Sequence, residues 1–161
     1  MKILNKEVYK QKKISVFVGS YKFGRTPDLI DVCLEIWPVS GINHVENNFT
    51  NFDDRHPWDQ VFDVKRFMEN YTDVERTRFV ITNSPYVVQS IIHFSGFDSK
   101  NVGIYECKKD DNGDVILTDC SDDCRGIFTE MAGPMDGIMD VIRDSEERER
   151  LEKMKMDSKD E

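Results

Sequence analysis

The sequence predicts an α/β fold with a small, mainly parallel sheet, flanking helices and a C-terminal β-hairpin. Apolar runs at 14–18 and 79–81 have the length and the β-branched or aromatic composition of buried strands. Each run is followed by turn residues and then by apolar residues at helical spacing, which is the alternation typical of parallel sheets covered by helices. The Asn112-Gly113 pair favours a type I′ turn, and therefore a hairpin, between two later strands.

The composition excludes several classes of protein. The 161 residues are enough for one domain with a substantial core, and 39% of them are apolar. The formal net charge of −9 disfavours a broad electrostatic surface for nucleic acid. Four Cys do not suggest a disulfide scaffold, and no apolar run has the length of a signal peptide or a membrane span. We therefore expect a cytoplasmic protein that does not enter a membrane.

The clearest local signal is the stretch 78–88. Its apolar strand leads directly into a helix, because Ser84 is a typical N-cap residue and Pro85 suits the first helical position. The polar residues from Thr82 to Ser84 are therefore expected at the carboxyl end of a strand and the amino end of a helix. Open α/β sheets place their ligands at this position.

A glycine-containing loop follows the first strand. Gly19 and Gly24 are separated by four residues and followed by Arg25 and Thr26, ahead of a helix expected over 28–37. This is the spacing of a P-loop, in which backbone N–H groups and a helix N-terminus hold phosphate, except that Arg25 replaces the usual Lys. The alternative is a surface turn between strand and helix with incidental glycines.

The remaining elements follow from periodicity and turn residues. Pro38 is expected to end the first helix. The other predicted elements are a strand over 42–46, a loop over 47–54, helices over 57–70 and 85–94, strands over 102–107 and 115–118, and short helices within 127–142. Charged residues dominate the rest of the chain. We expect one α/β domain over 1–142 and a charged helical or disordered tail over 143–161.

Two short motifs together resemble a known family. The first is His56-Pro57-Trp58-Asp59-Gln60 at the start of a helix, and the second is the strand that ends in Thr82-Asn83-Ser84-Pro85. In this order and spacing they resemble the C-terminal half of ABC-type AAA ATPases of the OLD and SMC kind. The resemblance implies a P-loop NTPase-like fold and ATP with Mg²⁺ as the cofactor. It also implies nucleotide phosphate contacts from Gly19, Gly24, Arg25, Thr26 and Asn83.

Several residues depart from the catalytic pattern of that family. Asn83 stands where the family has a His that contacts the γ-phosphate, and Asn cannot carry a proton. Glu46 and Asn47 are nearest to the position of the Walker B carboxylates, whereas Asp53 and Asp54 are expected in a loop too close to the next helix. The chain also lacks room for the family's signature helix. Because phosphoryl transfer depends on several such parts, we assign no catalytic residue and expect binding rather than hydrolysis.

The sequence therefore favours a degenerate, non-hydrolysing ABC-ATPase-like module that binds a partner protein. A DNA-repair or phage-defence ATPase is the natural hypothesis for that partner. One alternative is a small nucleotide hydrolase that uses the Gly19–Thr26 loop. A second alternative is a DNA-binding accessory protein, because lysines cluster at the N-terminus, namely Lys2, Lys6, Lys10, Lys12 and Lys13.

The cysteines give only a weak metal-binding pattern. Cys107, Cys120 and Cys124, with His93 or Cys33 as a fourth ligand, include one pair at zinc-like spacing but no second tight pair. The alternative interpretation is that these residues are free Cys that pack as small apolar side chains. We therefore assign no metal ligand.

Overall fold

The computed structural model of the chain describes residues 1–19, 23, 26–40, 49–73, 75, 77–124 and 135–159. Its strands are β1 (Ile14–Gly19), β2 (Phe49–Thr50), β3 (Arg78–Thr82), β4 (Val102–Lys109) and β5 (Val115–Asp119). Among the described residues these form one five-stranded sheet in the order β2-β3-β1-β4-β5. All neighbours pair in parallel except β4 and β5, which are antiparallel. The predicted α/β fold with a mainly parallel sheet is thus confirmed.

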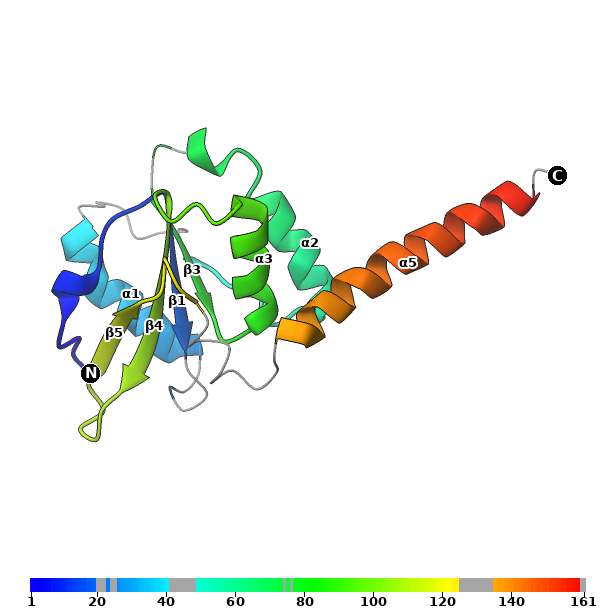
Figure 1. Cartoon of the computed structure of the whole chain (residues 1–161). Coiled ribbons are helices and arrows are strands. Elements are labelled where there is room, and N and C mark those ends of the chain that lie inside the picture. Colours follow the sequence, from blue (N-terminus) through cyan, green and yellow to red (C-terminus); the bar gives the residue numbers. More distant parts are fainter. Residues whose placement is uncertain are drawn as a thin grey trace.

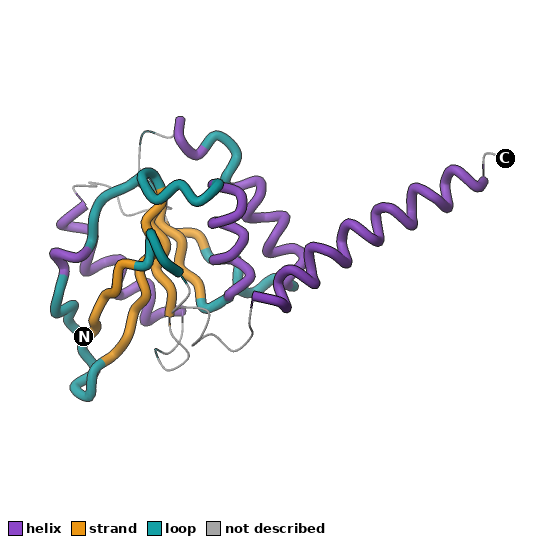
Figure 2. The backbone as a smooth tube through the Cα atoms, in the orientation of Figure 1, coloured by secondary structure: helices purple, strands orange, loops and turns teal. Residues whose placement is uncertain are grey.

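Helices cover both faces of this sheet, with α1 on one face and α2 and α3 on the other (Figure 1). Figure 2 shows the resulting layers, in which the strands lie between two sets of helices. The helical elements are η1 (Lys6–Val8), α1 (Thr26–Ser40), α2 (Pro57–Phe67), η2 (Tyr71–Asp73), α3 (Pro85–Ser95) and α5 (Met135–Lys159).

Side chains of the central strands alternate between two apolar cores. Phe17 and Phe79 belong to the core under α1, together with Leu29. Val16 and Val80 belong to the core under α2 and α3. Because both faces of the sheet are covered, the strands read as continuous apolar runs rather than as alternating ones.

Helix α1 does not end where its proline predicts. It continues to Ser40 and so contains Pro38 in its last turn. Pro38 has no N–H to donate to the carbonyl of Leu34, but its fixed φ is compatible with a helix. The loss is therefore confined to one hydrogen bond at the end of the helix.

The second strand also differs from the prediction. β2 lies inside the stretch 47–54 that was predicted to be a loop, and it pairs with Phe79 and Val80 of β3. Two residues give no alternation, so periodicity alone cannot reveal such a strand. The strand predicted over 42–46 lies outside the described residues.

The starts of α2 and α3 are built differently. The Trp58 N–H donates to Nδ1 of His56 at 3.3 Å, so His56 caps α2. Ser84 occupies the N-cap position of α3, but its hydroxyl donates to Oε1 of Gln60 at 2.6 Å and does not cap the helix. The predicted side-chain cap was therefore wrong, because Gln60 offers the hydroxyl a competing acceptor. Gly96 ends α3 in the left-handed region with a φ of 64°.

The predicted hairpin of β4 and β5 forms, but its turn is not of the predicted type I′, because Gly113 and not Asn112 has a positive φ. The Asp110 N–H donates to the Asp114 carbonyl at 2.8 Å, which closes the turn. Gly113 has a φ of 80°, a value that glycine adopts without steric cost.

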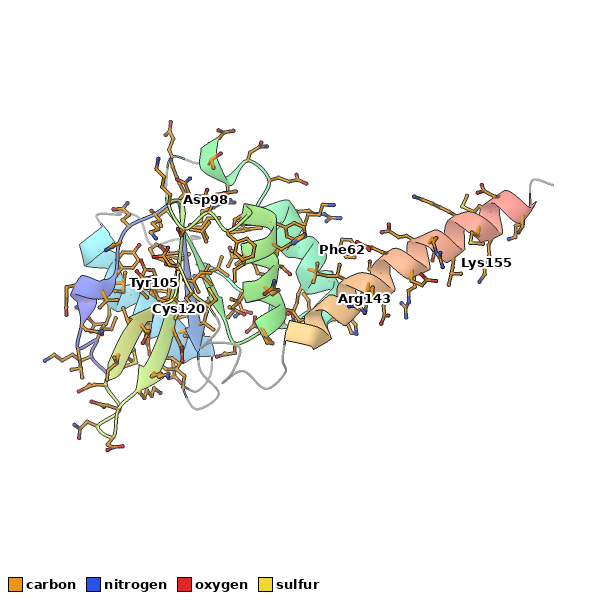
Figure 3. The ribbon with its side chains drawn as sticks, viewed as in Figure 1. Phe62, Asp98, Tyr105, Cys120, Arg143 and Lys155 are labelled. Atoms are coloured by element: carbon orange, nitrogen blue, oxygen red, sulfur yellow. The ribbon has the colours of Figure 1, made fainter. Side chains whose placement is uncertain are left out.

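Helix α5 begins against the sheet domain and then extends away from it. Ile142 packs against the core under α2 and α3, and the Arg148 guanidinium lies 5.5 Å from the centre of the Trp58 ring. Figure 3 shows Arg143 near α2 and Lys155 far out along the projecting helix. The tail predicted from residue 143 therefore starts inside a continuous helix. None of the described helices has the length and apolarity that a membrane crossing requires.

Candidate functional site

The carboxyl ends of the parallel strands bring distant segments together. Val18, the residue before Gly19, pairs with Thr82 on the neighbouring strand β3. Strand β2 lies on the other side of β3, and the loop after β2 carries Asp53. We call Gly19, Asp53, Thr82 and Asn83 the carboxyl-edge cluster. It lies at the edge where open α/β sheets bind ligands.

Asp53 is the centre of this cluster. Its Oδ1 accepts a hydrogen bond from the Thr82 hydroxyl at 2.6 Å, and its Oδ2 accepts one from the Asn83 backbone N–H at 2.6 Å. The Thr82 hydroxyl oxygen accepts a further bond from the Ser84 N–H at 2.9 Å. Hydrogen bonds to a charged acceptor are the stronger kind, so Asp53 ties the loop after β2 to the start of α3.

The surroundings of Asp53 raise its pKa above the ordinary value. Burial is the largest cause, because it disfavours the charged carboxylate, and repulsion from Asp54 adds to it. The bonds from Asn83 and Thr82 stabilise the charged form and oppose this shift without cancelling it. Perturbed carboxyls of this kind are concentrated at functional sites, although structural networks also produce them.

Gly19 and Asn83 are in close contact. A Cβ atom placed on Gly19 would lie 2.1 Å from Oδ1 of Asn83, closer than any real contact, and 3.4 Å from Cδ1 of Phe23. The Asn83 amide therefore occupies the space that a side chain at position 19 would take. The Asn83 side chain thus packs directly against the backbone of β1 at Gly19.

A second set of hydrogen bonds supports the cluster. The Asn51 amide nitrogen donates to the Ile81 carbonyl at 3.1 Å, and its oxygen accepts from the Asp53 N–H at 2.9 Å. Gln60 of α2 accepts from the Ser84 hydroxyl and is itself buried. The side chains that contact Asp53 are therefore held in place by their own partners, which is a requirement for a preorganised site.

Glu106 adds another carboxylate near the same edge. It lies on β4, its Cα pairs with Val18, and it is only 4% exposed. Its Oε1 is 3.2 Å from Nζ of Lys108. Lys108 therefore places a positive charge beside this carboxyl, although the contact does not have the geometry of a hydrogen bond.

The structure brings together two of the five predicted phosphate contacts. Gly19 and Asn83 touch at the edge of the sheet. Gly24 and Arg25 lie outside the described residues, and so does the side chain of Thr26, whose backbone begins α1. The strand, glycine and helix order predicted for this loop is present.

Asp53, which joins the segments of the cluster, was not among the predicted site residues. Asp53 does lie in a loop, as predicted, but that loop follows a strand and reaches Thr82 and Asn83. It was excluded because it lies close to the start of the next helix, and the short strand β2 just before this loop was not predicted. The usable signal was the polar run after Phe49, since polar residues directly after a strand belong at the ligand-binding edge.

The cysteines are divided between the two faces of the sheet. Cys33 and Cys107 lie in the core under α1, whereas Cys120 lies in the opposite core and Cys124 packs against it. Burial raises the pKa of Cys120 to about 11 and that of Cys124 to about 12. Within the described part of the chain, no group of three or more His, Cys, Asp or Glu residues could hold a metal ion.

The basic N-terminal segment is folded onto the domain. Ile3 is buried and forms a parallel bridge with Val115, which adds the segment to the free edge of β5. Nζ of Lys6 pairs with Glu35 at 2.7 Å, and Nζ of Lys12 donates to the Ser99 carbonyl at 2.5 Å. These lysines have partners within the protein, which weakens the case for an arm that binds DNA.

Comparison with known proteins gives no relative. No protein family, no characterised protein and no solved structure matches this chain. The function must therefore be inferred from the geometry of the described residues.

Proposed function

We propose that this chain is a binding module that holds the phosphate end of a nucleotide at its carboxyl-edge cluster without hydrolysing it. The observation that carries the proposal is the contact between Gly19 and Asn83, with Asp53 bonded to the Asn83 N–H. Three separate segments supply these residues at the ligand-binding edge of the sheet. The resemblance to a P-loop NTPase of the ABC type points to the same ligand.

The donor set of the cluster suits a nucleotide with Mg²⁺. Mg²⁺ is usually held by one or two carboxylates together with substrate phosphates rather than by a cage of protein ligands. Asp53 is such a carboxylate, and its two oxygens retain lone pairs beyond the bonds they accept. Bound Mg²⁺ would neutralise phosphate charge at this acidic edge. The Asn83 amide offers a neutral hydrogen-bond donor to a phosphate oxygen.

The same residues argue against hydrolysis. A general base must take a proton from the attacking water, and the amide of Asn83 cannot do so. Asp53 is the carboxylate of the cluster, and we assign it to Mg²⁺ rather than to a general base, because a carboxylate that holds the metal is not free to take a proton from water.

Calorimetric titration with Mg·ATP and Mg·GTP, combined with a phosphate-release assay, tests this proposal. We expect binding without phosphate release. Asn83→Asp, which changes the amide to a carboxylate of the same shape, should weaken binding about tenfold or more by charge repulsion. The matched control is Asn112→Asp in the exposed hairpin turn, which should bind as the unmodified protein does. No heat with either nucleotide would reject the site, and steady phosphate release would support the hydrolase instead.

A protein partner is the second function that an observation favours. Helix α5 extends beyond the domain and exposes Leu151, Met154 and Met156 (Figure 1). Long exposed helices with apolar side chains commonly pack against another protein. We therefore propose that α5 binds the partner, with an ABC-type ATPase of DNA repair or phage defence as the hypothesis that the sequence resemblance suggests.

Affinity capture with the full chain and with a Leu151→Lys, Met154→Lys variant tests the role of α5. Both changes lie on exposed positions and leave the domain intact. We expect an ATPase recovered with the unmodified chain to be lost with the variant. Equal recovery with both proteins would show that α5 does not carry the interaction.

A further inference from the structure

A cavity lies between α3 and β4, away from the carboxyl-edge cluster. Its volume is about 190 Å³, and it is lined by α3, the turn after α3, the first half of β4 and the segment that follows β5. Val102, at the start of β4, is part of its wall. Since the cluster lies at the opposite ends of the parallel strands, the cavity is a separate feature.

Gln89 is a buried polar side chain in the wall of this cavity. It is only 9% exposed, and its amide makes no hydrogen bond with any described residue. It lies on the same face of α3 as Ile92, which also lines the cavity. The amide is not among the fully buried polar atoms that lack a partner, so its polar atoms are open to the space of the cavity. Gln89 therefore offers a donor and an acceptor to an occupant of the cavity.

The other walls combine an apolar floor with an acidic rim. Val102 and Ile104 are each 3% exposed and form the floor together with Ile92. Asp98 and Asp122 lie at the rim, and no Lys, Arg or His is among the described residues that line the cavity. Hydrogen bonding from Tyr71 lowers the pKa of Asp98, so this carboxyl is charged at neutral pH. An anion is disfavoured here, and a cation with an apolar body fits both surfaces.

Phe97 at the mouth of the cavity is unusual in two respects. It has a φ of 62°, a conformation that bulky residues rarely adopt, and its side chain is 78% exposed. It also lines the cavity. Strained residues and exposed large apolar side chains are both associated with ligand sites. Figure 3 shows Asp98, the next residue in the chain, near the end of α3.

We propose that this cavity binds a compact organic cation, in which an apolar ring or branched chain rests on Ile92, Val102 and Ile104 while an ammonium group faces Asp98 and Asp122. A hydrogen-bonding group of the ligand pairs with Gln89. The size is adequate for a single ring with a short arm, because an apolar cavity of about 150 Å³ already holds benzene. The site does not depend on the proposed nucleotide binding.

A titration followed by ¹H–¹⁵N NMR with the full chain tests the proposal. Benzylamine is the probe, and benzyl alcohol and benzoate have the same ring but a neutral or a negative head group. We expect benzylamine to shift amide signals of residues 89–104 and 121–124, benzyl alcohol to bind more weakly, and benzoate not to bind. Shifts confined to other segments, or equal binding of benzoate, would overturn the proposal.

Two substitutions separate the contributions of the polar groups. Gln89→Leu keeps the side-chain size but removes the amide, and it should reduce affinity for benzyl alcohol by about threefold to tenfold. Asp122→Asn should weaken benzylamine about twofold to fivefold, the effect of losing one exposed ion pair. Asp111→Asn, an exposed control in the hairpin turn, should leave the affinity unchanged. The NMR spectra also report whether each variant is folded, and a folded Gln89→Leu variant that binds as before would reject the role of Gln89.

Discussion

The contact between Gly19 and Asn83 is the residue-level feature on which the carboxyl-edge cluster depends. Gly19 is not among the described glycines with a positive φ, so its backbone conformation does not require a glycine. The constraint at this position comes instead from Asn83, whose Oδ1 fills the position of a Cβ atom, so any other residue here requires the Asn83 side chain to move. The glycine that the P-loop spacing singled out thus has a packing role against Asn83.

Gly19→Ala should displace the Asn83 side chain, since the new Cβ atom would lie 2.1 Å from Oδ1. In an Asn83→Ala background the same change should be neutral or stabilising by about 0.4–1 kcal/mol, because alanine restricts the unfolded chain. Denaturant unfolding of the four proteins measures the coupling between the two positions. We expect a coupling energy of about 1 kcal/mol, which is within the range for residues in contact. Additive effects would contradict the contact.

Asp53→Ala should destabilise the fold by about 1–3 kcal/mol, because it leaves the Asn83 N–H and the Thr82 hydroxyl without their acceptor. Asp54→Ala is the matched control and should change stability by less than about 0.5 kcal/mol, since Asp54 is exposed. Thermal or denaturant unfolding measures the stability of both variants. Similar losses for the two variants would show that the hydrogen bonds of Asp53 contribute little.

The pH dependence of the same variants checks the pKa of Asp53. A carboxyl whose pKa is raised in the folded state favours folding most below its unfolded pKa, and this contribution is lost as pH rises through the folded pKa. As pH rises from the unfolded to the folded pKa of Asp53, the unmodified protein should therefore lose more stability than the Asp53→Ala variant does. An opposite difference would mean that the hydrogen bonds outweigh burial.

At the scale of elements, the sequence predicts long and regular segments better than short ones. The step from β3 to α3 follows from an apolar run, Ser84 and Pro85, and it forms with the expected bounds to within a residue. β2 has only two residues and exists because it can pair with β3. Since β2 positions Asp53, the same limit hid the central residue of the candidate site. Tertiary pairing, rather than local preference, decides such strands.

The hydrogen bond between Tyr71 and Asp98 joins η2 to the turn after α3 at 2.6 Å. Burial and this carboxylate raise the pKa of Tyr71 to about 12, while the hydroxyl lowers the pKa of Asp98. The stabilisation from Tyr71 is thus complete below its unfolded pKa and is lost as pH rises through the folded value. The contribution of Asp98 is present above its unfolded pKa and is lost as pH falls through the folded one.

Asp98→Asn should therefore shift the ionisation of Tyr71 to lower pH, though not fully to the unfolded value, because burial remains. Ultraviolet absorbance of the phenolate measures this shift in a pH titration. Tyr71→Phe identifies the contribution of Tyr71 among the other tyrosines. An unchanged titration curve in Asp98→Asn would contradict the hydrogen bond.

Helix α5 should divide into a packed part and a free part. Ile142 lies in the core contact, whereas every described side chain from 151 to 159 is exposed. Removing residues 151–161 should change the free energy of unfolding by less than about 0.5 kcal/mol. Ile142→Ala should cost about 1–2 kcal/mol, since a half-buried side chain loses part of its apolar burial. A large loss on truncation would mean that the outer helix contacts the domain.

On the scale of the whole molecule, one sheet separates two cores, and the two candidate sites lie at opposite ends of its parallel strands. The sequence identifies most buried apolar residues, because strands covered on both faces are apolar throughout. It does not identify which core each residue joins, since a one-residue change of register exchanges the faces. The cysteines illustrate this limit, because a zinc site drawn from their spacing would have to cross the sheet between Cys107 and Cys124.

The same division allows the cooperativity of the fold to be measured with thiol chemistry. Cys33 and Cys107 are buried under α1, and burial raises the pKa of both thiols, so neither reacts in the folded protein. Cys120 is buried in the opposite core, whereas Cys124 is partly exposed. If the domain unfolds as one unit, Cys33, Cys107 and Cys120 should be labelled at the same rate, because each thiol reacts only after global opening. Denaturant should then increase the three labelling rates in parallel.

Alkylation of the native protein, read residue by residue with mass spectrometry, gives these rates. Cys124 should react first, and a Cys124→Ser variant removes any effect of its modification on the other thiols. Equal rates for Cys33, Cys107 and Cys120 would mean that the sheet couples the two cores into one cooperative unit. A faster rate for Cys120 would mean that the core under α3, which contains the cation cavity, opens without the core under α1, and that ligand binding there can stabilise one half of the molecule alone.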